Sequence, residues 1–367
     1  MFQTVKYTSA ITLGLTVAVG GLSPIASAAD FYKGKTLSTV ISGSAGGNTN
    51  LQARTFMRFM KKHIPGKPRI VNRNMGGSGG LLATNFVGEV APRDGTMLWV
   101  GTMSFISQLV GDPALRVKFT DFTVVGGIGQ QGVVHIRKDT PPGISKPADL
   151  FKVTAPFKTC GYRPGHSVDL HVKLTLSMLG IKHKHVSGFR SSSKMHKALL
   201  QNEIQMGFDS TAGFRRRVTP VLIKPGISVA LWHAGVPTEN GGLESSPNFP
   251  DLPTFLDVYR MKFGKNATPK GIQWESYLLI TGLRSRLLRA IMLPPGSPKA
   301  AITTLRAAWA KTVKDPEFLK TYVKLNKGQP FVTLGEEANR YLVKTAAEAD
   351  PKVIAYLKSF KGKKKRK

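Results

Sequence analysis

Short apolar runs alternate with glycine-rich loops and amphipathic segments along this chain, and this alternation constrains the fold more than any other feature. Strands are expected at 36–41, 69–71, 97–100, 122–125, 133–136, 204–208 and 228–231. Helices are expected at 51–63, 81–90, 167–179, 194–200, 298–314 and 334–356. Strands that alternate with helices form mainly parallel sheets with helices on their faces. We therefore predict an α/β protein.

Length and composition set the number and type of domains. A chain of 367 residues suits two domains better than one, and 41% hydrophobic residues are enough to fill two cores. The single cysteine, Cys160, excludes an internal disulfide framework and a multi-cysteine metal site. The eight histidines show no metal-ligand spacing. We therefore expect neither a metal nor a cofactor.

The first 28 residues have the pattern of a secretory signal peptide. Lys6 supplies the positive charge, 11–22 is an apolar stretch, and Ala26-Ser27-Ala28 is a small-residue cleavage site. The apolar stretch is shorter than the ~20 residues that a membrane-spanning helix needs. We expect export to the periplasm, with cleavage before Ala29.

The net charge is large and positive, with 53 basic and 21 acidic residues giving +32. Residues 361–367 are expected to form a basic, disordered tail. The remaining charge is scattered, without interleaved aromatic residues and without a nucleic-acid-binding motif. A specific nucleic-acid role is therefore not expected, although a cationic protein that binds nucleic acid or an anionic surface stays an alternative.

Two glycine motifs suggest enzymes but have the wrong context. Gly127–Gly132 matches GxGxxG, yet a strand and not a helix is expected to follow, so a dinucleotide site is not predicted. Gly76–Gly80 matches GxSxG, and an exported hydrolase with Ser78, Asp209 and His233 is the alternative reading. We favour a glycine loop that lets the backbone approach another domain or a ligand.

Two other glycine loops stand between a strand and a helix, where free backbone N–H groups and the helix dipole favour an anion. A carboxylate is a natural small ligand there, and Arg163 can pair with one in bidentate fashion. Asp209 is expected either to accept a hydrogen bond from the ligand or to cap a helix. The candidate ligand-binding residues are Ser42, Gly43, Ser44, Gly46, Gly47, Asn48, Thr49 and Asn50 in the first loop, Gly161, Arg163, Gly165, His166 and Ser167 in the second, and Ser104 and Asp209.

The order of these motifs resembles the substrate-binding proteins of tripartite tricarboxylate transporters, the Bug family. The resemblance rests on the first loop through Arg54, on 74–80, on Ala91-Pro92-Arg93-Asp94-Gly95-Thr96, and on later short motifs that end with 294–298. It implies a two-lobed periplasmic binding protein of type II, a Venus flytrap whose lobes close over a small mono-, di- or tricarboxylate. It further implies a receptor that performs no chemistry and delivers its ligand to membrane permease subunits.

The resemblance also implies a division of the chain. We expect lobe 1 to comprise 29–132 and 249–360 and lobe 2 to comprise 133–248, with two hinge crossovers and a monomeric state. Asn50 stands where the family commonly has an aspartate, which removes a negative charge from the first loop. The additional Arg163 favours a dianionic ligand.

Overall fold

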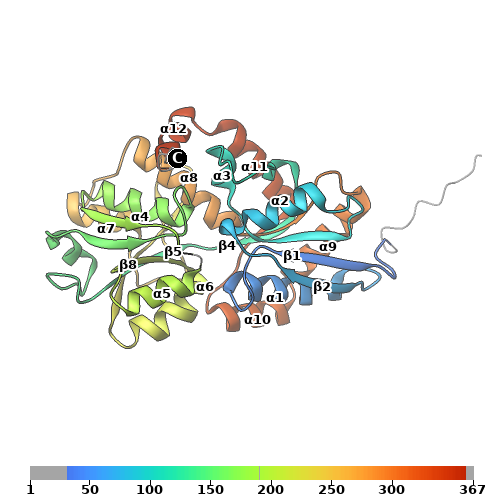
Figure 1. Ribbon diagram of the computed structural model, residues 1–367, viewed down its shortest axis with the longest axis horizontal. Helices are drawn as coiled ribbons and strands as arrows, with labels where there is room; N and C mark the ends of the chain where they lie inside the picture. Colours follow the sequence, from blue (N-terminus) through green and yellow to red (C-terminus); the bar gives the residue numbers. More distant parts are fainter. Residues whose placement is uncertain (1–30, 190, 361–367) are drawn as a thin grey trace, which may run out of the picture.

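The computed structural model describes residues 31–189 and 191–360, which form two α/β lobes side by side (Figure 1). The predicted signal peptide at 1–28 and the predicted tail at 361–367 lie outside the described residues. Within the described part, no helix is long and apolar enough to cross a membrane.

Lobe 1 is built on a six-stranded mixed sheet. Strands β1, β2 and β3 are parallel, whereas β12 lies antiparallel between β3 and β4. The strand predicted at 36–41 is confirmed as β1, with the same bounds. In sheet order the strands are β13 (Phe331–Leu334), β4 (Thr123–Gly129), β12 (Arg289–Leu293), β3 (Met97–Thr102), β1 (Thr36–Ile41) and β2 (Arg69–Asn74).

Helices cover both faces of this sheet. On one face the buried stripe of α1 packs on α9, with the rings of Phe56 and Trp309 5.4 Å apart. On the other face α2 and α11 bury Leu81, Val87 and Leu342 against the sheet. The lobe 1 helices are α1 (Asn48–His63), α2 (Leu81–Val90), α3 (Phe105–Leu109), α9 (Lys299–Thr312), α10 (Pro316–Asn326) and α11 (Gly335–Glu348), with short 3-10 turns at η1 (Ser78–Gly80) and η2 (Phe119–Asp121).

Lobe 2 repeats the strand order of lobe 1 in a five-stranded sheet. Its parallel strands β6, β7 and β8 are followed by β5, which is antiparallel to both β8 and β9. From one edge, both sheets therefore have the same order: the second parallel strand of the lobe, then the first, then the third, and then an antiparallel strand. In sheet order the strands are β7 (His183–Val186), β6 (Phe157–Cys160), β8 (Met206–Ser210), β5 (Gly132–Arg137) and β9 (Ser228–His233), and β10 (Val236–Pro237) pairs separately with β11 (Leu243–Glu244).

The helices of lobe 2 enclose a core centred on large aromatic side chains. Phe255 contacts the rings of Trp232 and Tyr277 at centroid distances of 5.9 and 5.0 Å. The remaining elements are η3 (Pro147–Lys152), α4 (Ser167–Met178), α5 (Ser192–Leu200), α6 (Thr211–Gly213), η4 (Phe214–Ile223), α7 (Phe255–Phe263), α8 (Ile272–Leu287) and α12 (Pro351–Ser359).

The first crossover runs from β4 into β5 through Gln130 and Gln131. Because a strand follows, the GxGxxG sequence does not open a helix, as the sequence predicted. Its glycines allow close packing instead: a Cβ on Gly129 would lie 1.6 Å from the Ser285 carbonyl oxygen, and one on Gly132 would lie 1.9 Å from the Phe208 ring.

The second crossover comes later in the chain than the expected return at residue 249. Helix α7 packs on β9 and η3, because Phe255 and Val258 belong to the lobe 2 core. The chain re-enters the lobe 1 sheet only through α8 and β12. The last helix also differs from expectation, since α12 packs on α8 and buries Val353 and Leu357 in the lobe 2 core.

The helix predicted at 334–356 is two helices. Residue 351 is a proline at the start of α12, and Asp350 caps that helix by accepting from the Lys352 N–H. Because proline cannot donate its backbone nitrogen to the preceding turn, the helix ends and a new one begins.

Candidate functional site

A cleft of about 670 Å³ lies between the two lobes. Both predicted glycine loops contribute to it, together with the GxSxG loop and the end of α8. Nine of the predicted residues line it: Ser42, Gly43, Ser44, Gly47, Asn48, Thr49, Arg163, His166 and Asp209. The other six lie beside the cleft without lining it: Gly46, Asn50, Ser104, Gly161, Gly165 and Ser167.

The first loop is held by the strands around it, and the start of α1 faces the cleft. Ser42 Oγ accepts from the Thr102 N–H at 3.0 Å, and Asn74 donates to the Gly43 carbonyl at 2.7 Å. Helix α1 begins at Asn48 without a side-chain cap among the described residues and without an acidic residue in its first turn. Its first amides and its dipole therefore favour an anion in the cleft.

The second loop is different, because a carboxylate of the protein itself already occupies it. Asp169, in the first turn of α4, accepts from the backbone N–H groups of Tyr162 (2.8 Å) and Arg163 (3.3 Å). Gly161 is required there, since a Cβ would lie 2.1 Å from this carboxyl carbon. Burial acts to raise the pKa of Asp169, but hydrogen bonds from His185 and Ser187 and the nearby His166 hold it below its usual value.

Arg163 does not present its guanidinium to the cleft as a free carboxylate partner, which corrects the expectation. It forms an ion pair with Asp112 and donates to Ser107 Oγ at 2.8 Å. Both partners belong to lobe 1, whereas Arg163 belongs to lobe 2. The guanidinium therefore joins the lobes at the edge of the cleft.

Two buried arginines that the sequence did not point to line the cleft instead. Arg284, on α8, donates to Ser167 Oγ at 3.0 Å, and Arg289, on β12, donates to Thr102 Oγ1 at 2.9 Å. Arg284 is 7% exposed and Arg289 is 6% exposed. The Nε atom of each has no hydrogen-bond partner among the described residues. Neither guanidinium has a carboxylate within ion-pair distance in that part of the chain.

Burying these two charged groups costs free energy. Arg284 lies beside the start of α4, and Arg289 lies beside the start of α1. Burial, together with the charge of Arg289, lowers the pKa of Arg284 to about 10, although Tyr162 and the Asp209 carboxylate act to raise it, and burial lowers the pKa of Arg289 to about 10. Both groups stay charged at neutral pH. A buried charge without a partner is unfavourable until a counter-ion arrives, so the cleft is electrostatically prepared for an anion.

Two predicted residues that line the cleft, His166 and Asp209, are hydrogen-bonded to other groups of the protein. His166 caps α4, because its Nδ1 accepts from the Val168 N–H at 3.1 Å, and burial lowers its pKa to about 3. Asp209 does not cap a helix, since Ser210 caps α6. Its carboxylate lies between His135 and His196, at 3.2 and 3.0 Å.

The GxSxG loop lacks the partners that a hydrolase needs. Ser78 is exposed on a 3-10 turn, and the two proposed partners do not form a pair: His233 contacts Ser245, and Asp209 contacts other histidines. The loop instead brings backbone against the other lobe. A Cβ on Gly79 would lie 3.3 Å from both Arg163 Nε and His166 Cδ2. This is the close approach that the sequence favoured.

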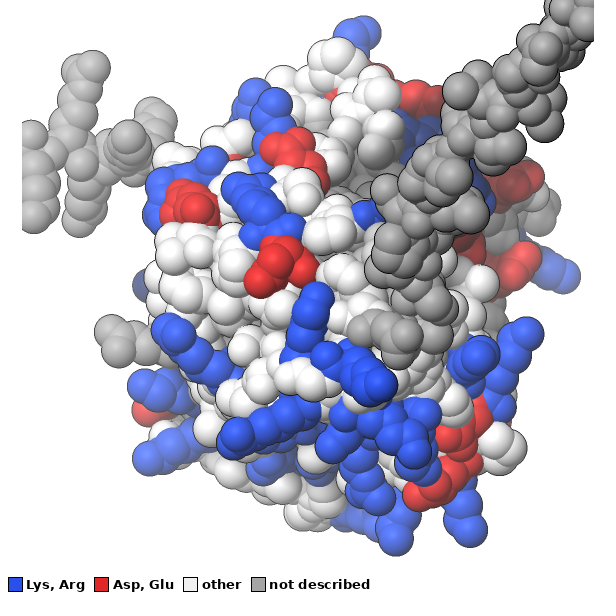
Figure 2. Space-filling model, turned by 90° about the vertical axis from the view of Figure 1, so that its right-hand side faces the viewer, with Lys and Arg blue, Asp and Glu red and all other residues white. Residues whose placement is uncertain are grey.

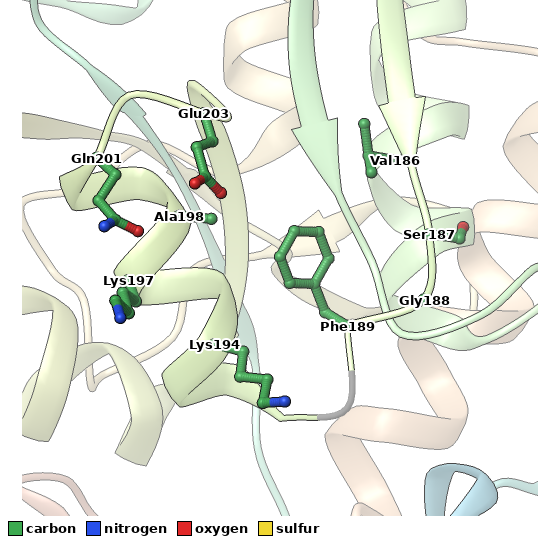
Figure 3. Close-up of a pocket in the computed structure, with 9 residues that line it drawn as sticks. All are labelled: Val186, Ser187, Gly188, Phe189, Lys194, Lys197, Ala198, Gln201 and Glu203. Atoms are coloured by element: carbon green, nitrogen blue, oxygen red, sulfur yellow. The ribbon is translucent and has the colours of Figure 1, made fainter.

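A second pocket, of about 490 Å³, lies in lobe 2 between α5 and the loop after β7, and it shares Gly188 and Phe189 with the lining of the cleft (Figure 3). Phe189 fills its centre, while Lys197 and Gln201 point away from it (Figure 3). Its cations are ordinary surface lysines on α5. We therefore place the functional site in the interlobe cleft.

Ser104 and Ser167 have structural roles beside the cleft. Ser104 Oγ donates to the Gly79 carbonyl at 3.2 Å and so holds the GxSxG loop. Ser167 accepts from Arg284 and orients that guanidinium. The sequence did contain a signal for Arg284: it occupies the same helical stripe as Tyr277, Ile280 and Leu287, where a charge is rarely buried without a partner.

Comparison with solved structures identifies the fold. The chain matches the periplasmic binding protein BugD with a TM-score of 0.64 at 18% identity, covering 90% of this chain and 98% of that one. It matches MatC from Rhodopseudomonas palustris with bound malate with a TM-score of 0.61 at 19% identity, covering 89% and 99%. A third match, the R. palustris protein Rpa4515 with adipate, has a TM-score of 0.64 at 18% identity, covering 89% and 98%.

No protein-family model and no curated protein matches the sequence. The structural matches extend over both lobes, and together with the shared strand order they establish a two-lobed periplasmic binding protein fold of type II. The fold predicted from the order of the motifs is thus confirmed. Of the three solved proteins, BugD is a periplasmic binding protein, MatC holds malate and Rpa4515 is solved with adipate.

Proposed function

We propose that this protein is a solute receptor of the Bug type that captures a small dicarboxylate between its lobes. The observation that carries the proposal is the pair of buried guanidinium groups in the cleft, Arg284 and Arg289, which have no carboxylate partner among the described residues. The charge of Asp209 acts on Arg284 without an ion-pair contact, so a ligand with two carboxylates would give each guanidinium a direct partner. The malate and adipate held by two proteins of the same fold support this ligand class.

In this proposal one carboxylate of the ligand lies at the start of α1, near Thr49 and Arg289. The second lies near Arg284 and the start of α4, where Asp169 has already taken the loop amides. Closure brings Arg163 onto Asp112 and seals the edge of the cleft. The ligand favours the closed state because only that state surrounds it with both lobes.

The receptor is further proposed to act in the periplasm after cleavage near Ala28, and to deliver its ligand to the permease subunits of a tripartite tricarboxylate transporter. The predicted signal at 1–28 and the fold support this location and partner. The closed form is the one that the permease would recognise.

A thermal-shift screen with malate, succinate, adipate, matched monocarboxylates and inorganic phosphate tests the ligand class. A dicarboxylate at about 100 times its dissociation constant is expected to stabilise the protein by about 2.7 kcal/mol. The shift should persist in high salt, because the binding charges are buried. Equal shifts with every polyanion, lost in high salt, would contradict the proposal and favour surface binding.

A further inference from the structure

The end of lobe 1 carries a face of basic side chains, visible as the blue area over the lower part of Figure 2, where α1, β2 and α10 lie (Figures 1 and 2). These three elements are neighbours, since α1 packs on both β2 and α10. We call this surface the basic face. Its exposed members are Arg54, Arg58 and Lys61 on α1, Lys67 in the loop that follows, and Lys320 and Lys324 on α10.

The sequence concentrates these charges by its periodicity. Arg54, Arg58 and Lys61 recur at helical spacing on the side of α1 opposite its buried stripe. Lys320 and Lys324 recur in the same way on α10. No acidic residue occurs anywhere in 48–74, and the exposed Arg69 and Arg73 of the edge strand β2 point to the other side of the sheet, where Arg73 lies over the Phe86 ring of α2.

The charges of the basic face are not neutralised within the protein. None of its six members forms an ion pair with a carboxylate of the described residues. The acids at this end of the lobe are engaged elsewhere, Glu317 by Lys62 and Asp315 by His63. Like charges held on one face repel one another, so a polyanionic surface that meets them all at once is attracted strongly.

The chemistry of the basic face favours lipid over protein or nucleic acid. No large apolar side chain and no aromatic ring of the described α1 and α10 is exposed. A protein interface needs buried apolar or aromatic anchors, and single-stranded nucleic acid needs rings for stacking. Lysines and arginines on flexible stems are sufficient for a fluid layer of anionic headgroups.

We infer that the basic face docks the protein on the surface of a membrane that contains anionic lipid. The choice of lipid over duplex DNA rests on the periplasmic location proposed above. The docking itself is independent of the ligand, because the face and the interlobe cleft share no residue. It would keep the receptor close to the membrane that holds its permease.

Sedimentation with vesicles of phosphatidylcholine, with and without phosphatidylglycerol, tests the inference. The full exported chain should bind only the phosphatidylglycerol vesicles, and high salt should release it. Each cation near such a surface contributes about fivefold in binding, so the quadruple variant Arg58→Gln, Lys61→Gln, Lys320→Gln and Lys324→Gln should lose at least about 50-fold.

A second quadruple variant provides the control. Lys158→Gln, Lys182→Gln, Lys184→Gln and Lys224→Gln removes the same charge from exposed positions of lobe 2 and should change vesicle binding by less than about threefold. Equal losses in the two variants would overturn the inference, because net charge alone would then explain the binding. Tighter binding to duplex DNA than to the vesicles, abolished by the lobe 1 variant, would overturn it as well. Dicarboxylate-induced thermal shifts in both variants separate this result from a failure of the proposed function.

Discussion

The two lobes share a strand order but use the start of their first cleft-facing helix in different ways. In lobe 1, α1 begins without a cap and without an acidic residue, and its amides face the cleft. In lobe 2, α4 is capped by His166, and Asp169 binds the amides of its preceding loop. One helix start is therefore open to an external anion, while its counterpart already holds an internal one.

This difference shows how little a glycine loop alone says about ligand binding. Both loops have small residues and a hydroxyl before a helix, and both were expected to bind a carboxylate directly. What separates them is a single aspartate two residues into α4. In place of free loop amides, the guanidinium of Arg284 lines the cleft beside the start of α4, where it donates to Ser167 Oγ.

The largest effect is expected from removing the internal anion of lobe 2. Asp169→Asn should lower the free energy of unfolding by about 3 kcal/mol, because a buried carboxylate that accepts from two amides, His185 and Ser187 is replaced by a neutral group. Urea denaturation measures this. Asp251→Asn, an exposed acid in the same lobe, should cost less than about 0.5 kcal/mol. A ligand-affinity loss without destabilisation would mean that Asp169 serves the ligand.

The effect of Asp169→Asn on the free energy of unfolding is expected to depend on pH. The pKa of Asp169 is lower in the folded protein than in the unfolded chain, so its stabilisation is present above the unfolded pKa of about 3.9 and is lost as the pH falls through the folded value. The stability difference between the wild type and Asp169→Asn should therefore be constant near neutral pH and shrink below about pH 4. Acid unfolding of both proteins measures this difference. A gap that widens in acid would contradict the assignment.

The next largest effect concerns the buried arginines. Arg284→Met and Arg289→Met should each weaken dicarboxylate binding by about 100-fold, because each leaves one ligand charge buried without a partner. The ligand-free protein should become no less stable, since an unpaired buried charge is removed. Calorimetric titration and urea denaturation check the two effects. Arg286→Met, on the exposed side of the same helix, is the control. Parallel losses of stability and affinity would assign these arginines a structural role.

A smaller effect is expected from placing a carboxylate of the protein at the start of α1, as Asp169 is placed at the start of α4. Thr49 Oγ1 lies 3.2 Å from Thr102 Oγ1, which accepts from Arg289. Thr49→Asp therefore places a carboxylate close to that guanidinium, and it should weaken ligand binding by about tenfold while raising the melting temperature. Thr49→Asn keeps the shape without the charge and should change affinity by much less. If the two variants bind alike, the ligand does not occupy this helix start.

The smallest effect concerns the contact that joins the lobes. Asp112→Asn weakens the ion pair with Arg163 and should reduce ligand affinity by about fivefold, mainly through faster dissociation, since a partly exposed pair contributes about 1 kcal/mol. Stopped-flow release measures this. Asp121→Asn, another acid of lobe 1 that is exposed, should leave the rate unchanged. A large affinity loss with Asp112→Asn would place Arg163 on the ligand after all.

Local patterns predicted much of the fold, because they depend on neighbours in the sequence. The helix predicted at 81–90 and the strand predicted at 36–41 both have the same bounds in the structure. The pairing of Arg163 with Asp112 was not predictable, since the two lie 51 positions apart and meet only when the lobes come together. The two buried arginines were missed for a related reason: they interrupt the apolar pattern of α8 and β12, and only the cleft explains their burial.

The contact between Gly79 and lobe 2 has a consequence for how the cleft selects its ligand. At this edge the surface that meets Arg163 and His166 is main chain, with a positive φ of 65° and no side chain that can rotate aside. On the lobe 1 side the width of this gap is therefore set by the backbone, and only the Arg163 and His166 side chains on the lobe 2 side can change rotamer. A molecule too thick for this gap holds the lobes apart over their whole length. The cleft therefore selects by size, because such a ligand prevents the lobes from closing.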